Sequence, residues 1–194
     1  MAMKATPMPR GKISSRERMV NSAVKLLATR GAAGTTIDGV LADSAAPRGS
    51  VYHHFPGGRE ELITAAARVA GQRMSAFLQS DDGPLHPREA LAHLGEFFRS
   101  LLTTSDYRTG CPLVGLTVDG SDQMPAASEI AREVFIGWQE QYRDLLAAHD
   151  VPQPRAATLA TLTVAAIEGA VILARAQRST APLDDVIAEL TAQL

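Results

Sequence analysis

Apolar residues recur every three or four positions along most of this chain, which is the spacing of one face of an α-helix. Strict alternation of apolar and polar residues, the pattern of a half-buried strand, is nearly absent. The long segments with helical spacing are residues 14–31, 59–79, 87–102, 126–148, 155–177 and 183–193. Together with three shorter segments, the pattern predicts an all-α fold of about nine helices.

Capping residues fix both ends of the first helix. Ser14 and Glu17 have the spacing of a capping box, in which each side chain binds the other residue's backbone N–H. Gly31 follows the last apolar position and ends the helix, as glycine commonly does.

The shorter helices are expected at residues 35–44, 47–55 and 111–118. Threonines can cap the first of them, and a proline suits the first turn of the second. The run Pro56-Gly57-Gly58 then breaks the chain before the next long helix. Residues 111–118 are apolar and fit a helix or a strand, and their helical neighbours favour a helix.

Residues 156–174 are nearly uncharged and almost long enough to span a membrane. Glu168 and three threonines argue against a span, and the small residues Ala165, Gly169 and Ala170 suit close packing between helices. We therefore expect a core helix that also faces a partner subunit, and no membrane association.

The net charge of −2 conceals a strong asymmetry between the two parts of the chain. Residues 1–59 hold nine Lys/Arg against three acids, whereas the remainder holds ten against eighteen. Residues 1–12 carry three bases and no apolar core, so they are expected to form a flexible basic arm rather than a signal peptide. The basic part fits a polyanion such as nucleic acid, although a solvated basic face without a partner fits the charge equally well. Cys111 is the only cysteine, which excludes a disulfide within the chain and favours a reducing cytoplasm.

Residues 34–55, GTTIDGVLADSAAPRGSVYHHF, have the order of a helix-turn-helix: a short helix, a tight turn and a second short helix. This segment, and especially RGSVYHHFP at 48–56, resembles the signature of the TetR family of bacterial transcriptional regulators. Residues 57–62 resemble the link of the family's LmrA/YxaF-like branch, which is one residue longer than usual. The resemblance to this branch continues at Gly110-Cys111-Pro112-Leu113, at Trp138, and in the motifs at 168–170 and 173–178. The turn Ser44-Ala45-Ala46 lacks the glycine that is common in the family, and an alanine can replace it if that residue has a negative φ.

The resemblance implies three segments: an arm at 1–12, a helix-turn-helix domain at 13–58, and a ligand-binding and dimerisation domain at 59–194. It implies that two helix-turn-helix units, one from each subunit of a homodimer, read a palindromic operator in double-stranded DNA. Hydroxyl, guanidinium, imidazole and phenol groups would contact phosphates or base edges, and a glycine would let the recognition helix approach the bases closely. The residues implied are Thr35, Thr36, Pro47, Arg48, Gly49, Tyr52, His53 and Arg59.

The C-terminal domain is implied to hold a small hydrophobic or aromatic inducer in a helical bundle. Candidates to line the cavity are Met74, Phe77, Phe98, Leu102, Cys111, Leu113, Trp138, Tyr142 and Glu168. Most of these could equally be core residues; Trp138 and Tyr142, one turn apart, best suit a flat aromatic or cationic ligand. A salt bridge to Arg175 or Arg143 explains Glu168 more simply than a cavity does. Cys111 is expected to be an inert buried thiol rather than a sensor.

The sequence contains no recognisable catalytic arrangement, phosphate-binding loop or cluster of metal ligands, so we expect neither an enzyme nor a cofactor. Adjacent residues on a helix diverge by about 100°, so His53 and His54 are not expected to share a metal. We expect a sequence-specific repressor that an inducer releases from its operator, and the branch resemblance implies control of an efflux or detoxification gene. The alternative is a DNA-binding regulator without a small-molecule ligand, whose body binds a protein.

Overall fold

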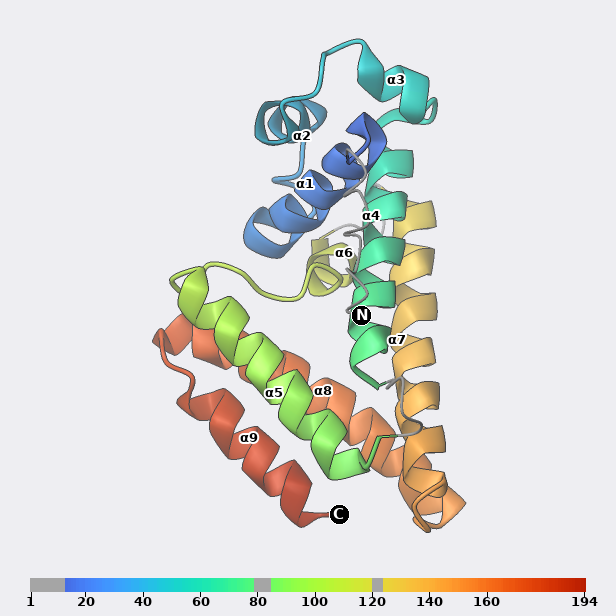
Figure 1. Cartoon of the computed structure of the whole chain (residues 1–194), viewed down its shortest axis with the longest axis vertical. Coiled ribbons are helices and arrows are strands. Elements are labelled where there is room, and N and C mark those ends of the chain that lie inside the picture. The colour runs from blue at the N-terminus through green and yellow to red at the C-terminus, as the bar shows by residue number, and fades with distance from the viewer. Residues whose placement is uncertain (1–12, 79–84, 120–123) are drawn as a thin grey trace, which may run out of the picture.

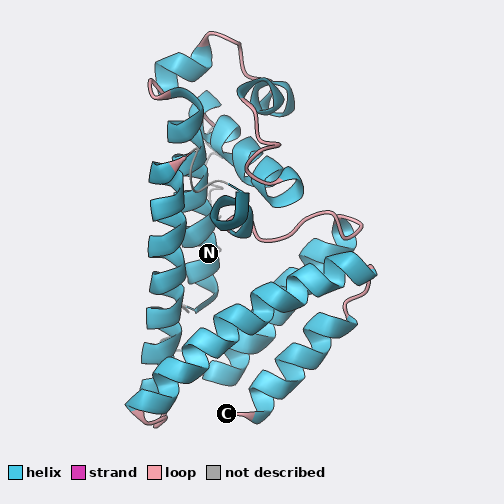
Figure 2. Ribbon diagram, turned by 180° about the vertical axis from the view of Figure 1, so that it is seen from behind, coloured by secondary structure: helices cyan, strands magenta, loops and turns pink. Residues whose placement is uncertain are grey.

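The computed structural model describes residues 13–78, 85–119 and 124–194, and the predicted basic arm lies outside these ranges. Within the described residues the chain forms nine α-helices, one 3-10 turn and no strand. Figure 2 shows the helices and the loops that connect them. The all-α prediction is confirmed. The elements are α1 Ser15–Arg30, α2 Ile37–Ser44, α3 Ser50–His54, α4 Gly58–Ser75, η1 Ala76–Leu78, α5 Pro87–Thr104, α6 Val114–Asp119, α7 Pro125–Ala147, α8 Gln153–Gln177 and α9 Ala181–Ala192.

The predicted caps of α1 and α2 are present. Glu17 N–H donates to Ser14 Oγ over 3.1 Å, and Ser14 N–H donates to Glu17 Oε2 over 2.8 Å. Gly31 ends α1 with φ of 70°, in the region that glycine adopts without steric cost. Thr36 is the N-cap of α2 and accepts from Gly39 N–H over 3.1 Å. These local hydrogen bonds satisfy backbone groups that a helix end leaves unpaired.

The turn between α2 and α3 differs from the prediction. Ala45 has φ of 51° and ψ of 35°, so it does not have the negative φ with which an alanine would fit this turn without strain. Helix α3 begins at Ser50 rather than Pro47, because both the N–H and the hydroxyl of Ser50 donate to Pro47 O, over 2.9 and 2.6 Å. Residues 47–49 therefore form a turn that leads into a five-residue helix.

Two hydrophobic cores follow one another along the molecule (Figure 1). The first joins α1, α2 and α3 to α4, α6 and the N-terminal half of α7, and the second joins α5, α8 and α9 to the rest of α7. Helices α4 and α7 lie side by side and run in the same direction, and the N–H of Ala126 at the start of α7 donates to Glu60 Oε1 on α4. Met74, near the end of α4, packs against both cores.

Helix α8 is long and apolar enough to cross a membrane by length and composition alone. In the structure it packs between α7 and α9, and it contributes eight buried residues. Ala170 is buried inside the subunit, so it does not face a partner, whereas Leu162, Ala165 and Leu173 are exposed. The outward apolar face of α8 is thus a different stripe from the one that contains Ala170.

Candidate functional sites

Helix α3 lies at one end of the molecule (Figure 1), and its exposed side chains are polar. Val51 and Phe55 are fully buried in the first core, whereas Tyr52 and His53 are exposed, as are Arg48 and Gly49 in the turn before the helix. A Cβ atom added to Gly49 would meet no atom within 4 Å, so the surface around it is open. The apolar face anchors α3 to α1, and the opposite face is free to enter a DNA groove.

The N-terminus of α2 adds backbone donors to the same end of the molecule. Thr36, the N-cap of α2, is exposed, and the first N–H groups of α2 have no backbone partner within the helix. Pro47, in the turn before α3, is exposed as well. An α-helix N-terminus attracts phosphate through these N–H groups and the helix dipole. Six of the eight expected DNA residues therefore lie at the surface of this end.

The other two expected DNA residues, Thr35 and Arg59, have partners inside the protein. Thr35 is 1% exposed, and its hydroxyl donates to Gly31 O over 2.8 Å. Arg59 donates from Nε to Thr35 O over 2.8 Å and from Nη2 to Ala32 O over 2.5 Å. Its third contact is with the sulfur of Met124 at 3.2 Å. The guanidinium fastens the α1–α2 loop to α4 and α7, which corrects the expectation that it reaches phosphate.

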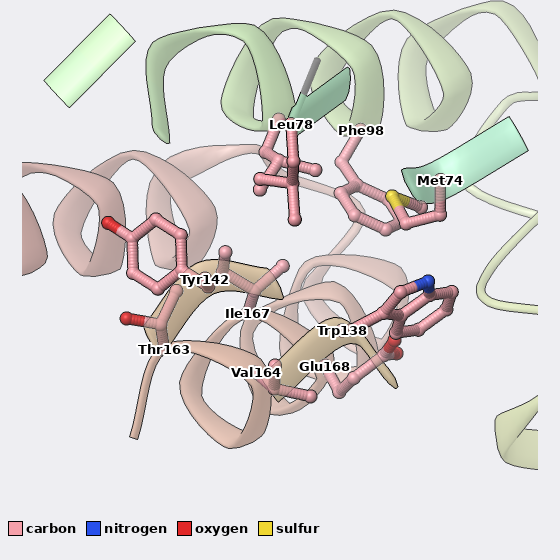
Figure 3. Close-up of a pocket in the computed structure, with 10 residues that line it drawn as sticks. Met74, Leu78, Phe98, Trp138, Tyr142, Thr163, Val164, Ile167 and Glu168 are labelled. Atoms are coloured by element: carbon pink, nitrogen blue, oxygen red, sulfur yellow. The ribbon is translucent and has the colours of Figure 1, made fainter. Parts of the chain in front are cut away.

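A small cavity of about 40 Å³ lies where α4, α5, α7 and α8 meet. Its lining contains five of the nine expected ligand residues: Met74, Phe98, Trp138, Tyr142 and Glu168. Figure 3 shows Trp138 and Glu168 at one end of this cavity and Tyr142 with Thr163 at the other. The indole N–H of Trp138 donates to Gly71 O on α4 over 3.3 Å, so the cavity wall is fastened to the helix that leads to α3.

The remaining four expected ligand residues lie elsewhere. Phe77 lines a separate, largely apolar cleft of about 570 Å³ between α1, α4 and α5, which shares Met74 and Phe98 with the cavity. Cys111 lines a cleft of about 460 Å³ between α1, α6 and α8. Leu102 and Leu113 are fully buried core residues that line none of these spaces.

Comparison with known proteins identifies the family. Residues 20–73 match the model for bacterial regulatory proteins of the tetR family, and residues 87–189 match the LmrA/YxaF-like transcriptional regulator C-terminal domain. The chain belongs to the TetR family. It is therefore a DNA-binding transcriptional repressor and not an enzyme, and the resemblance to the LmrA/YxaF-like branch is confirmed.

The TetR-family assignment covers nearly the whole chain. An HTH-type transcriptional regulator of Mycobacterium tuberculosis strain H37Rv is 40% identical over 180 residues, which are 90% of this chain and 91% of the relative. LmrA of Bacillus subtilis is 28% identical over 173 residues, 87% of this chain and 90% of LmrA. A TetR regulator of Legionella pneumophila, at 19% identity, has the same fold with a TM-score of 0.83 over 95% of this chain and 99% of that one.

The sequence did not identify five further cavity residues of this TetR-family regulator. They are Leu78, Leu94, Thr163, Val164 and Ile167. Three of them lie on α8, where the sequence analysis had proposed only Glu168 as a cavity residue. Positions 164, 167 and 168 share one helix face, and that spacing was the available signal.

Glu168 does not form the salt bridge expected from the sequence. Arg143 pairs with Asp144 over 2.8 Å, and Arg175 donates to Arg108 O over 3.2 Å. Among the described residues, Glu168 Oε2 is buried without a hydrogen-bond partner. Burial raises the pKa of this carboxyl to about 7, and a hydrogen bond with Cys111 opposes that shift.

Cys111 is also buried, and desolvation, followed by the nearby charge of Glu168, raises the pKa of its thiol. A thiol with a raised pKa is a poor nucleophile, which agrees with an inert role. No group of three or more His, Cys, Asp or Glu side chains that could hold a metal occurs within the described ranges.

Proposed function

We propose that this repressor is released from its operator by a small, largely apolar aromatic molecule bound between α4, α5, α7 and α8. The observation that carries the proposal is that α4 forms part of the cavity wall. Met74 on α4 lines the cavity, and α4 follows the recognition helix α3 directly in the chain. A ligand that displaces the end of α4 would therefore rotate α3 away from its position in the DNA groove.

The present cavity represents the closed, DNA-binding form in this proposal. Its volume of about 40 Å³ is far below the roughly 300–1,000 Å³ of sites that bind drug-sized molecules. Met74 and Phe98 separate it from the apolar cleft of about 570 Å³. Movement of these two side chains would join the spaces, and methionine adapts to such changes at low cost. Because Met74 belongs to α4, enlargement and helix displacement are coupled.

TetR-family regulators bind DNA as dimers, and we propose that α8 and α9 form the dimer contact here. Leu162 and Leu173 on α8 are 48% and 51% exposed within one subunit, which leaves an apolar face to be covered. Dimerisation would place two α3 helices about 34–36 Å apart, the spacing of successive major grooves. Members of the family are typically cytoplasmic, and the aromatic lining suits control of an efflux or detoxification gene.

Coupling between the two sites tests the proposal. An operator is first selected from a random duplex pool, and an aromatic ligand is then identified by thermal shift. Ligand should weaken operator binding by about 5–150-fold, and saturating operator should weaken ligand binding by the same factor. A ligand whose affinity is unchanged by operator would contradict release by an inducer. If operator binding instead responds only to a protein partner of the C-terminal domain, the chain is the alternative, a DNA-binding regulator without a small-molecule ligand.

The DNA face is tested in the same assay. Arg48→Ala should weaken operator binding by about 1–3 kcal/mol, because an arginine in the groove pairs with guanine edges. Arg132→Ala is the matched control, since Arg132 is exposed on α7 and pairs only with Glu129. Equal operator affinity of Arg48→Ala and wild type would show that this face does not read the bases.

A further inference from the structure

Among the residues that the structure describes, Glu168 is the only carboxylic acid in the lining of the cavity. Apart from Thr163 and the hydroxyl of Tyr142, the other lining side chains are apolar or aromatic. The Glu168 carboxyl has a hydrogen bond with Cys111, but among the described residues its Oε2 atom is buried without a partner. A buried oxygen without a hydrogen bond costs free energy. The protein's own contacts thus leave one strong acceptor beside an aromatic cavity.

The nearby cations do not neutralise this carboxyl. Arg30 and Arg175 line the cleft on the other side of Glu168, together with Cys111. Neither arginine forms an ion pair with Glu168 within 4.0 Å in the described structure, and no basic residue lines the cavity itself. A counter-charge inside the cavity would have to come from a bound molecule.

We propose that Glu168 selects inducers that carry one positive charge on an aromatic body, and that the charge lies between the Glu168 carboxylate and the Trp138 ring. The inference rests on the proposed inducer site and adds the chemical class of the ligand. A cation over an indole face gains energy from the ring quadrupole, and the gain is largest where water is excluded. Trp138 is 7% exposed, so the site is nearly dry.

The charges around the apolar cleft set the orientation of such a ligand. Lys25 and Arg73 line that cleft, on the far side of Met74 and Phe98 from Glu168. Lys25 is ion-paired with Asp43 over 2.5 Å, whereas Arg73 donates to the neutral side chain of Asn21. A positive end is therefore repelled mainly by Arg73 and attracted by Glu168. The cationic end therefore enters the inner cavity, and the aromatic body occupies the apolar cleft.

The protonation of Glu168 predicts that the binding of a cationic ligand depends on pH. Because burial raises the pKa of this carboxyl to about 7, a cation that binds the carboxylate displaces a proton and binds more tightly as the pH rises toward about 7.5. The titratable or charged groups around it are Cys111, Tyr142 on α7, Arg30 on α1 and Arg175 on α8. The thiol and phenol stay neutral in this range, since burial raises the pKa of each.

Trp138 is the only tryptophan of the chain, so its fluorescence reports binding directly. The full-length protein is titrated at pH 7.5 with N-methyl-4-phenylpyridinium and with 4-methylbiphenyl, which has the same shape without the charge. Wild type should bind the cation at least about tenfold more tightly than the neutral compound. Glu168→Gln should lose this preference and keep its affinity for 4-methylbiphenyl, which also shows that the variant is folded. Glu140→Gln, an exposed position on α7, should behave as wild type.

Each other outcome has a definite meaning. Equal affinity of wild type for the two compounds, or an unchanged preference in Glu168→Gln, would overturn the role of Glu168 while leaving an aromatic inducer site in place. If neither compound changes the Trp138 fluorescence, the cavity does not bind aromatic ligands, and both this inference and the proposed inducer site fail.

Discussion

Single residues in this protein carry roles that depend on what surrounds them. Arg59 has the charge expected of a phosphate contact, but three internal acceptors hold its guanidinium. Ala45 adopts a left-handed conformation that costs an alanine roughly 1 kcal/mol, because the α2–α3 turn requires it. Glu168 keeps a buried oxygen without a partner. In each case the neighbours decide the role of the side chain.

Glu168 should make stability fall with rising pH. Its pKa is about 7 in the folded protein and 4.5 in the reference state, so between these values the folded state holds a proton that the unfolded state has lost. The contribution is fully present below about pH 4.5 and is lost as the pH rises through about 7. Relative to Glu168→Gln, wild type should lose on the order of 1–3 kcal/mol between pH 5 and pH 8. Urea unfolding at fixed protein concentration measures the difference, and parallel pH profiles would contradict it.

Among the elements, α4 and α7 form the rigid connection between the two ends of the molecule. They pack closely at Gly71, where an added Cβ atom would lie 2.6 Å from Val134 Cγ2. The same glycine accepts the Trp138 hydrogen bond through its carbonyl oxygen. Close approach of these helices therefore fixes both the cavity wall and the direction of α4.

Gly71→Ala should separate the two helices and destabilise the protein by about 1–3 kcal/mol, because the branched Val134 side chain cannot move away by a simple rotation. Adding Val134→Ala should recover much of that loss, as thermal unfolding and a double-mutant cycle would show. Gly137→Ala is the matched control: its Cβ would meet no atom within 4 Å, so the change should be neutral or mildly stabilising. Additive effects of Gly71→Ala and Val134→Ala would contradict the close contact.

At the scale of the whole molecule, the two cores place the DNA face and the apolar face of α8 in different regions of one subunit (Figure 1). The cavity lies where the second core meets α4, and Met74 belongs to both cores. In the proposed mechanism a change in the cavity reaches the DNA face through α4, whereas the exposed residues Leu162 and Leu173 on α8 do not line the cavity. Ligand response and dimerisation can be tested separately.

The double variant Leu162→Arg with Leu173→Arg should be monomeric in sedimentation velocity and bind the operator poorly, because the apolar face of α8 would gain two charges. Its helical circular dichroism should persist, since both side chains are exposed in the subunit. Ala170→Arg would instead disrupt the subunit core, because Ala170 is 1% exposed. Ile136→Arg, on an exposed site of α7, is the control and should stay dimeric. A dimeric double variant would show that α8 does not form the contact.

The sequence by itself determined the nine helices of the described residues, their caps at Ser14 and Thr36, the helix-turn-helix and the family. The helices and caps depend on residues a few positions apart, so periodicity and capping record them directly. The helix-turn-helix and the family are recorded in the order of short motifs along the chain. It also identified Trp138, Tyr142 and Glu168 as unusual among apolar positions.

Only the tertiary structure decided the partners of Arg59, the left-handed φ of Ala45, the burial of Ala170 and the missing counter-charge of Glu168. The same holds for the separation of the inner cavity from the apolar cleft by Met74 and Phe98. Apart from the turn at Ala45, each of these depends on how segments tens of residues apart pack together. A side chain's partners and the space beside it are set by that packing, and local spacing along the chain does not contain them.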